Sequence, residues 1–390
     1  MFVNKFLFTL AYYYYIISQA MLHRYKQYPS PAFNMISLVS TVLNDRKGVS
    51  IFLKEMEMQS HHPDEIVIVD GGSIDGTWEF LVSYAANGLL PLKYYLEVGC
   101  NVARGRNIAI EKSNFNSDII VSTDIGCQWE SKWLEELIAP LELDRTVDYV
   151  VGSWAVKPEY IQTAWAKTEF ILRGRHIFQA TPDAQGTSRS IAYRKAVWQA
   201  VGGYPEDLTL AADDNVFILL LQKYGYKAAA APIVRCYWHR FDYLKQYLKE
   251  EKRNFYGLGE AFLARKNFVV VGGRLLTEFL CILGSFLILA DSPWLYYGLT
   301  TLLIFACSII HRIFRFLPKA TSLADLDVKF PLIRLLIFEY LAKIVGISSY
   351  ILGLLHGIKH CRNCRVRIYQ NPKAHGTELS TTITPTPKSL

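Results

Sequence analysis

The chain has 390 residues and a net charge of +7, and 51% of its residues are hydrophobic. This length suggests one large domain or two modest ones, and the mean hydropathy of +0.14 is high for a soluble enzyme. The apolar residues are concentrated between positions 268 and 358, whereas the sequence up to about Gly259 has mixed charge and frequent turn residues. The composition therefore predicts a soluble domain followed by a membrane-embedded region.

The basic residues lie beside the apolar segments, in residues 311–319 and 360–367. Such flanks are typical of the cytoplasmic membrane face and its anionic lipids, so we expect membrane lipids as partners and no nucleic acid. The seven cysteines have no framework spacing and predict reduced thiols. Cys361 and Cys364 have metal-type spacing but lack a second pair, which favours an ordinary juxtamembrane tail over a zinc site.

Residues 1–34 form an apolar leader with a basic flank after Met21 and Leu22. The leader has no cleavage site of the secretory type, so it is either a short signal anchor or the result of a wrongly assigned start. In the second case translation begins at Met35, directly before the first predicted strand. The sequence leaves both possibilities open.

Strands and helices alternate after the leader. Strands are predicted at 35–42, 65–69, 92–96 and 118–122, and helices at 49–58, 77–86 and 103–112. This alternation predicts an α/β domain with a mostly parallel, doubly wound sheet and flanking helices, which we place at residues 35–238. Ligands of such sheets bind beyond the carboxyl ends of the strands, so the residues that follow each strand are the candidates for function.

The rest of the chain is predicted to contact the membrane. Residues 239–267 read as an interfacial amphipathic region, and 268–360 as two or three membrane helices, in which Arg274 and Glu278 can pair. Residues 361–390 read as a basic and then disordered tail. With two spans both basic clusters stay cytoplasmic, so the positive-inside rule favours two spans, or a third segment that does not fully cross. The expectation is a multi-pass membrane protein with a cytoplasmic catalytic domain.

Four stretches stand where an active site at the sheet edge would need them: residues 40–45, 64–77, 99–110 and 121–127. In the second, a strand delivers Asp70 to the edge, where an acid can accept hydrogen bonds from a nucleobase or ribose. In the third, Arg104 and Arg106 begin a helix, whose amino end attracts anions such as a diphosphate. The plainer alternatives are a well-capped turn and two arginines on a solvated helix face.

Together these stretches resemble the family 2 glycosyltransferases, which have a GT-A fold and use nucleotide-sugar donors. The resemblance runs from about residue 35 to residue 256, and it is most specific in residues 64–77 and in the helix containing 103–107. The residues to which it assigns donor binding are Thr41, Asn44, Asp70, Gly72, Ser73, Asp75, Arg104, Asn107 and Asp124.

The resemblance extends into the second half of the domain. Residues 186–195 and 201–206 look like the acceptor-side segment of the family, which implies roles for Thr187, Ser188 and Arg189. An acidic pair then opens a helix, and its second member would be the catalytic base. That role falls on Asp214, with Asp213 beside it as part of the catalytic pair. The alternative is that both acids only cap the helix and are stabilised by its dipole.

The implied mechanism is a single inverting displacement, in which Asp214 takes the proton of an acceptor hydroxyl as its oxygen attacks the anomeric carbon. The leaving diphosphate needs a cation or fixed donors. In the family an Asp-x-Asp motif serves the ribose and a divalent metal, but here Asp124 is followed by Ile125 and Gly126. One acid can suffice for Mg²⁺ or Mn²⁺, so we expect a divalent metal on Asp124, with His239 as a candidate second ligand.

The sequence thus predicts a membrane-associated inverting glycosyltransferase, acting on a lipid-linked acceptor or a surface glycan in cell-envelope polysaccharide biosynthesis. The chain lacks the Gln-x-x-Arg-Trp signature of processive synthases, which favours addition of single sugars. The competing hypothesis is a catalytically silent relative that binds nucleotide sugar or serves as a membrane scaffold. The absent second acid at position 126 is the reason to consider it.

Overall fold

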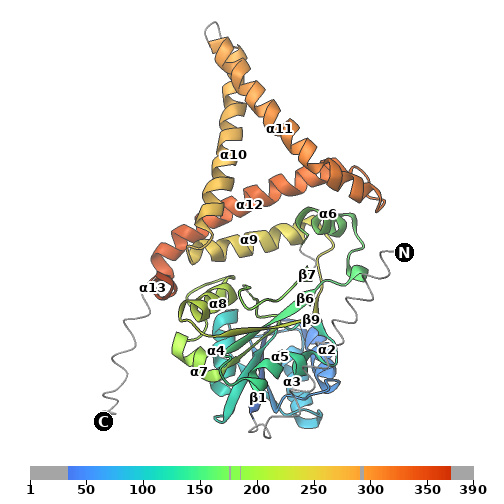
Figure 1. Cartoon of the computed structure of the whole chain (residues 1–390), viewed down its shortest axis with the longest axis vertical. Helices are drawn as coiled ribbons and strands as arrows, with labels where there is room; N and C mark the ends of the chain where they lie inside the picture. Colours follow the sequence, from blue (N-terminus) through green and yellow to red (C-terminus); the bar gives the residue numbers. More distant parts are fainter. Residues whose placement is uncertain (1–33, 175–176, 185, 290–293, 370–390) are drawn as a thin grey trace, which may run out of the picture.

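The computed structural model describes residues 34–174, 177–184, 186–289 and 294–369. The predicted leader and the predicted disordered end of the tail lie outside these ranges. The first half of the chain folds into strands and helices in the order β1 (Met35–Val42), α2 (Arg46–Glu57), β2 (Glu65–Asp70), α3 (Thr77–Asn87), β3 (Leu92–Leu96), α4 (Val102–Lys112), β4 (Ser117–Ser122), β5 (Cys127–Trp129) and α5 (Trp133–Leu143) (Figure 1). The helix expected from residue 49 begins earlier because Asp45 caps it, accepting a hydrogen bond from the Gly48 N–H at 2.9 Å.

The second half of the domain continues the same sheet. Its elements are β6 (Tyr149–Ala155), η1 (Pro158–Tyr160), α6 (Ala164–Arg173), β7 (Ile177–Phe178), β8 (Ile191–Arg194), α7 (Lys195–Val201), α8 (Asp213–Lys223) and β9 (Ala228–Trp238). The strand order is β3-β2-β1-β4-β8-β6-β9-β5, with β7 paired to β6. Strands β1 to β4 pair in parallel, as predicted, but β8 joins both β4 and β6 in antiparallel fashion. The sheet is therefore mixed rather than mostly parallel.

The central strands are buried on both faces, which explains their continuous apolar sequences. In β1, Leu38 lies in the core that α2 and α5 cover, and the next residue, Val39, lies in the core that α4 and α8 cover. This alternation follows from the two-residue period of a strand. The sheet is thereby held between two helical layers, and the carboxyl ends of β1, β2 and β4 meet at one edge.

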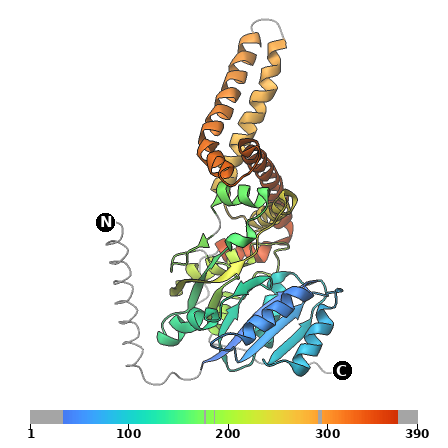
Figure 2. The same ribbon diagram turned by 90° about the vertical axis from the view of Figure 1, so that its right-hand side faces the viewer.

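Six elements follow the sheet domain: α9 (Leu244–Glu260), α10 (Arg265–Ser285), η2 (Phe286–Leu289), α11 (Trp294–Ala324), α12 (Pro331–His360) and α13 (Arg362–Tyr369). Figures 1 and 2 show that α10 and α11 project from the sheet domain as a hairpin, whereas α12 runs across its open end beside α9. Three helices in the described ranges are long and apolar enough to cross a membrane, and of these α12 is the most buried within the protein. The start of the predicted tail is helical, because Cys364 and Ile368 of α13 pack into the core beside α8.

A buried ionic cluster joins the three long helices. Glu278 of α10 accepts hydrogen bonds from Arg312 and Ser308 of α11 and from Tyr340 of α12, the last at 3.0 Å. Arg312 also lies 3.5 Å from Glu339 of α12. The partner of Glu278 is therefore Arg312, not Arg274 as the spacing along one helix suggested. Ionisable groups in apolar helices are costly unless paired, so this cluster fixes how the helices meet.

Glycines allow α9 and α12 to pack closely. A Cβ atom added to Gly353 would lie 2.0 Å from the carbonyl oxygen of Tyr256, and one added to Gly259 would lie 2.3 Å from that of Tyr350. Small residues at helix contacts permit this kind of backbone approach. The sheet domain, which continues into α9, is thus held against the apolar helices by a tight contact.

Replacement of Gly353 by Ala is expected to destabilise the protein by about 1–3 kcal/mol, because the added methyl group forces the two backbones apart. Gly273 on α10 is the matched control, since a Cβ added there meets nothing within 4 Å. Gly273→Ala should therefore leave the stability unchanged or raise it by up to about 1 kcal/mol. Thermal unfolding of the two variants in detergent measures the difference, and equal shifts would contradict the close contact.

Candidate active site

The predicted site residues come from the carboxyl ends of three neighbouring strands and from two helices. Asn44 follows β1, Asp70 ends β2, and Asp124 follows β4. The helix α4 brings its basic residues to this edge, and α8 begins with Asp213 and the adjacent Asp214. The structure therefore gathers residues that are up to 170 positions apart, counting from Asn44 to Asp214.

Asp70 is buried at the end of β2 and shapes the turn that follows it. Its Oδ1 accepts hydrogen bonds from the N–H groups of Gly72 at 2.9 Å and Ser73 at 2.7 Å. Its Oδ2 is buried and has no hydrogen-bond partner among the described residues. Gly72 has φ +101°, a conformation that favours glycine. One carboxylate oxygen thus holds the turn, and the other remains available to a ligand.

The other predicted residues of these two loops bind each other. The Asn44 N–H donates to Oγ of Ser73 at 2.8 Å, and Oδ1 of Asn44 accepts from the N–H of Ile74. Asp75 accepts hydrogen bonds from the N–H and hydroxyl of Thr77, and these bonds lower the pKa of its carboxyl group. These contacts fix the relative position of the β1 and β2 loops, which presents Asp70 to the sheet edge.

Helix α4 packs closely on β1. A Cβ added to Gly105 would lie 2.6 Å from Cγ2 of Thr41, so the predicted Thr41 lies under this helix. Asn107 is buried, and its side-chain amide forms two hydrogen bonds with the backbone of Tyr204, in the segment before α8. The amide donates to the Tyr204 carbonyl at 2.9 Å and accepts from the Tyr204 N–H at 2.9 Å. Arg104 is half exposed and pairs with Glu97 at 2.8 Å and Glu206 at 3.2 Å.

Arg106 occupies the centre of the site. Its guanidinium group is buried, donates to Asp124 at 2.5 Å, and also binds Asp213. It lies over the Tyr204 ring, with Cζ 5.4 Å from the ring centroid. Burial alone would lower the pKa of Arg106, but the charges of Asp213 and Asp124 raise it, so the side chain stays charged.

Asp214 lies next to this cluster. Its Oδ1 accepts from the Asn215 N–H at 2.8 Å, and its Oδ2 lies 3.5 Å from the N–H of Ser188. Burial raises the pKa of Asp214 above its ordinary value and the charge of Asp213 raises it further, whereas Arg106 lowers it. A carboxylate with a raised pKa is a better proton acceptor, which suits a general base.

The acceptor-side residues lie beside Asp214. Ser188 is buried, with Oγ 3.4 Å from the hydroxyl of Tyr204, and the Thr187 hydroxyl accepts from the Arg189 N–H at 3.4 Å. The Arg189 guanidinium lies on two indole rings, 3.7 Å from the centroid of Trp238 and 5.2 Å from that of Trp154. A cation held in this way keeps its position without an acidic partner.

Asp45 lies where the second acid of an Asp-x-Asp motif would be. Gly126 has φ +103°, so a side chain at this position would be strained. A Cβ built on Gly126 would have Oδ2 of Asp45 at 3.9 Å. Asp124 keeps a side chain that is 41% exposed, so a divalent cation could reach it. Asp45, which caps α2, and Asp124, which follows β4, are therefore the two carboxylates at this edge that could offer oxygen ligands to Mg²⁺ or Mn²⁺.

His239, the other predicted metal ligand, is exposed and lies 4.5 Å from the ring of Tyr160, measured between ring centroids. Among the described residues, His239 does not form a cluster with Asp124 and a third residue at the spacing of metal ligands. Sequence reasoning also missed Asp45 and the central role of Arg106. The position of Asp45 directly before a helix could have identified it as a cap at the sheet edge. The pairing of Arg106 could not be predicted in this way, because its partner Asp213 lies more than 100 residues further along the chain.

Comparisons with known proteins identify the domain. Residues 37–199 match the family model described as glycosyl transferase family 2. The chain is 25% identical over 183 residues to the O-antigen chain rhamnosyltransferase WbaN of Salmonella anatum, a match that spans 44% of this chain and only 56% of that relative. Its fold is similar to that of the mannosyltransferase PcManGT from Pyrobaculum calidifontis, solved with GDP-Man and Mn²⁺, with a TM-score of 0.50, 18% identity and coverage of 87% and 94% of the two chains.

Residues 37–199 therefore match a family 2 glycosyltransferase domain, the sheet domain has the GT-A fold, and three candidate membrane helices follow it. The match to the family model and the similar fold agree with the predicted family resemblance and with the predicted fold class.

Arg106 and Arg104 lie two residues apart on one helix but should differ in their contribution to stability. Arg106→Gln leaves Asp213 and Asp124 without their buried cation, which is expected to cost about 3–5 kcal/mol. Arg104→Gln removes only solvent-exposed ion pairs, so its effect should be much smaller. Denaturant unfolding of both variants tests this order. A small and equal loss would mean that the Arg106 cluster is not a structural requirement.

Proposed function

We propose that the protein is a membrane-associated, inverting glycosyltransferase that moves a sugar from a nucleotide-sugar donor to a hydroxyl or phosphate of a lipid-linked or surface-glycan acceptor. The observation that carries this proposal is the position of Asp214, a carboxylate of raised pKa beside the N–H of Ser188 and next to the Arg106 cluster. The O-antigen chain rhamnosyltransferase to which the chain is similar supports a surface-glycan acceptor.

In this proposal Asp70 and Asp124 bind the donor. The unpartnered Oδ2 of Asp70 accepts from the nucleobase or ribose, and the glycines after it let the nucleotide approach the backbone. Asp124, at the next strand end, contacts the ribose or a metal ion. Arg104, whose charge is shared by Glu97 and Glu206, and Asn107, whose amide binds Tyr204, then position the site.

Asp214 acts as the general base. Its carboxylate takes the proton of the acceptor hydroxyl while the acceptor oxygen forms a bond to the anomeric carbon, and the bond to the diphosphate breaks on the opposite face. Arg106 pairs with Asp213, so the Asp213 carboxylate is not free to accept the proton. Asp214 is therefore the carboxylate that accepts it. The Arg189 cation, fixed over Trp238, stands on the acceptor side, where it suits an acceptor that carries phosphate.

A divalent cation, when bound by Asp124 and Asp45, would neutralise charge on the diphosphate. The mannosyltransferase of similar fold was solved with Mn²⁺, which supports a metal of this kind. The ion pair between Arg106 and Asp124 opposes it, because one oxygen of Asp124 already has a cationic partner.

The same ion pair favours a second candidate function, a catalytically silent relative that binds nucleotide sugar or serves as a membrane scaffold. A protein with Asp124 held by Arg106 and with glycine at position 126 could retain the donor site without using a metal. The two candidates differ in turnover, since only the enzyme consumes its donor.

Removal of the base separates the two candidates. The purified protein in detergent is incubated with a panel of nucleotide sugars, and release of nucleoside diphosphate is measured. Asp214→Asn is expected to lower turnover by about 10²–10⁴-fold because the amide cannot accept the proton, while nucleoside diphosphate binding persists. The exposed Asp325→Asn is the control. Turnover that survives Asp214→Asn would remove Asp214 as base, and binding without turnover in the unmodified protein would favour the silent relative.

In the unmodified protein the rate should fall on the acidic side at a higher pH than an ordinary aspartate would require. Protonated Asp214 cannot accept the proton, and burial raises its pKa, so its active form is present above that raised pKa and is lost as pH falls through it.

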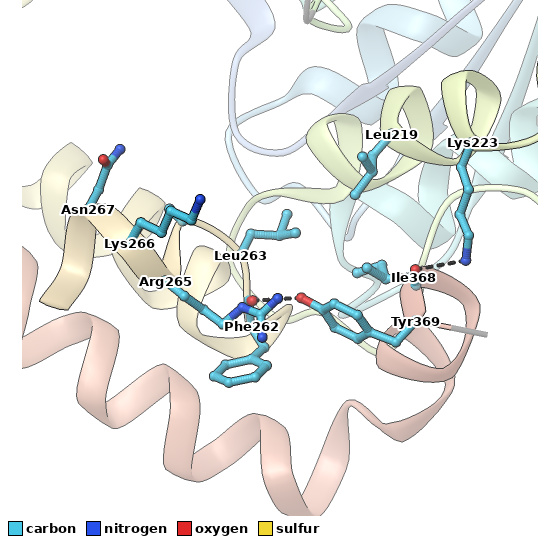
Figure 3. Close-up of a pocket in the computed structure, with 10 residues that line it drawn as sticks. Leu219, Lys223, Phe262, Leu263, Arg265, Lys266, Asn267, Ile368 and Tyr369 are labelled. Atoms are coloured by element: carbon cyan, nitrogen blue, oxygen red, sulfur yellow. Dashed lines mark hydrogen bonds between the residues drawn. The ribbon is translucent and has the colours of Figure 1, made fainter. Parts of the chain in front are cut away.

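We further propose that α10 and α11 cross the membrane while α12 lies at its cytoplasmic surface. The hairpin places the starts of α10 and α12 and the end of α11 on one side, together with the basic residues Arg265, Lys319, Lys329 and Arg334. At the start of α10, the exposed Arg265 and Lys266 line a pocket of about 480 Å³ (Figure 3), which suits contact with anionic lipid.

Labelling with a membrane-impermeant maleimide tests this topology. In a Cys307→Ser parent, whose own labelling is subtracted, Tyr296→Cys should react from the side opposite to the catalytic domain. Asp325→Cys, between α11 and α12, should react from the side of the catalytic domain. Sealed vesicles of known orientation distinguish the two, and labelling of both positions from one side would exclude a crossing hairpin.

A further inference from the structure

Three residues of different chemistry meet where α9 and α12 end. Glu260 is the last residue of α9, His356 lies in the last turns of α12, and Cys361 follows α12 directly. One ligand atom from each lies within 4.8 Å of the other two. Glu260 and Cys361 are fully buried, with 0% exposure, and His356 is partly exposed. The three groups therefore converge on one point at the junction of the sheet domain and the apolar helices.

One member of this cluster, His356, has a ring nitrogen without a hydrogen-bond partner among the described residues. Nδ1 of His356 lies 2.8 Å from Oε1 of Glu260, yet the two atoms form no hydrogen bond. Two electronegative atoms this close without a hydrogen bond are stabilised if a cation lies next to both. Oδ1 of the adjacent Asp207 is also buried without a partner in the described ranges.

The ligand set selects the kind of ion. Zinc binds thiolate sulfur at about 2.3 Å and imidazole nitrogen or carboxylate oxygen at about 2.0–2.2 Å, so its ligand atoms lie roughly 3–4 Å apart. The observed separations need only small side-chain adjustments to reach this geometry. Mg²⁺ and Ca²⁺ prefer oxygen ligands and are not normally coordinated by cysteine. One thiolate and one carboxylate also neutralise the charge of Zn²⁺.

The surroundings supply the outer contacts that metal ligands usually have. The carboxylate of Glu260 accepts hydrogen bonds from the Thr209 N–H at 3.0 Å and from its hydroxyl at 2.7 Å, which hold its orientation. The sulfur of Cys361 lies 2.9 Å from the carbonyl oxygen of Asp207, to which the thiol donates in the absence of a metal. Loss of that proton on metal binding would free the sulfur as a ligand.

We propose that Glu260, His356 and Cys361 bind one zinc ion, with water in the fourth position. This site is separate from the proposed donor site, and it joins three segments: α9, the end of α12 and, through Glu260, the loop containing Thr209. That loop leads into Asp213 and Asp214 only four and five residues later. The zinc ion would therefore hold the catalytic helix α8 in a constant position relative to the membrane helices.

The test begins with the unmodified full-length chain, without an affinity tag that could bind metal, purified in detergent and washed briefly with chelator. Mass spectrometry of the metal content should find about one zinc ion per chain. Replacement of zinc by Co²⁺ should give the near-ultraviolet absorption of a cobalt–thiolate bond. Absence of both zinc and this absorption in the unmodified protein would overturn the proposal, whatever the variants do.

Matched variants then test the ligands. Cys361→Ser and His356→Ala should each lose the bound zinc, and Cys361→Ser should also lose the cobalt–thiolate absorption. Cys307→Ser and His360→Ala are the controls, since Cys307 is exposed on α11 and His360 lies one turn beyond His356 with its side chain exposed. Both controls should keep the metal. The assignment would be overturned if the folded Cys361→Ser protein retained zinc. It would also be overturned if His360→Ala lost zinc while His356→Ala kept it.

Discussion

The buried ion pairs of Arg106 are the interaction on which the active-site edge depends. Moving a guanidinium group out of water is costly, and two carboxylates from different parts of the fold, Asp124 after β4 and Asp213 on α8, compensate for it. Arg106 forms ion pairs with both carboxylates at once. It therefore links the parallel half of the sheet, through Asp124, to the helix that carries Asp214, through Asp213. The position of the proposed base relative to the donor edge thus follows from one arginine.

The proposed donor site has a glycine, Gly126, where the second acid of the metal motif would be. The positive φ of Gly126 turns the chain away where a second acid would stand, and Asp45 approaches from the neighbouring strand end instead. An acid that caps α2 with one oxygen keeps the other for a ligand. In the proposed metal site, two loops would each supply one carboxylate, and the ion pair of Asp124 with Arg106 would leave only part of Asp124 for the metal.

The parallel half of the fold could be predicted from the sequence, because its strands are short runs with strand character and the first three are each followed directly by a helix. The antiparallel half could not, because β8 pairs with β4 and β6, which precede it by tens of residues, and no local pattern specifies that pairing. The same limit applies to the site. Asp70 and Asp214 stand at element ends that a pattern can locate, whereas Arg104 and Arg106 differ only in which side of α4 faces the core.

The proposed function gives the geometry of the membrane region a part in catalysis. A glycosyltransferase that modifies a lipid-linked acceptor must hold its base at a constant height above the bilayer, since a displacement of about 1 Å can cost a large part of the rate. Three features act on this height: the glycine contact of α9 with α12, the ionic cluster around Glu278, and the hydrogen bonds from Thr209 to Glu260. The last of these contacts reaches the chain only five residues before Asp214. In the proposed function, a rigid junction there, rather than a flexible linker, would let the sheet domain act on an acceptor confined to a surface.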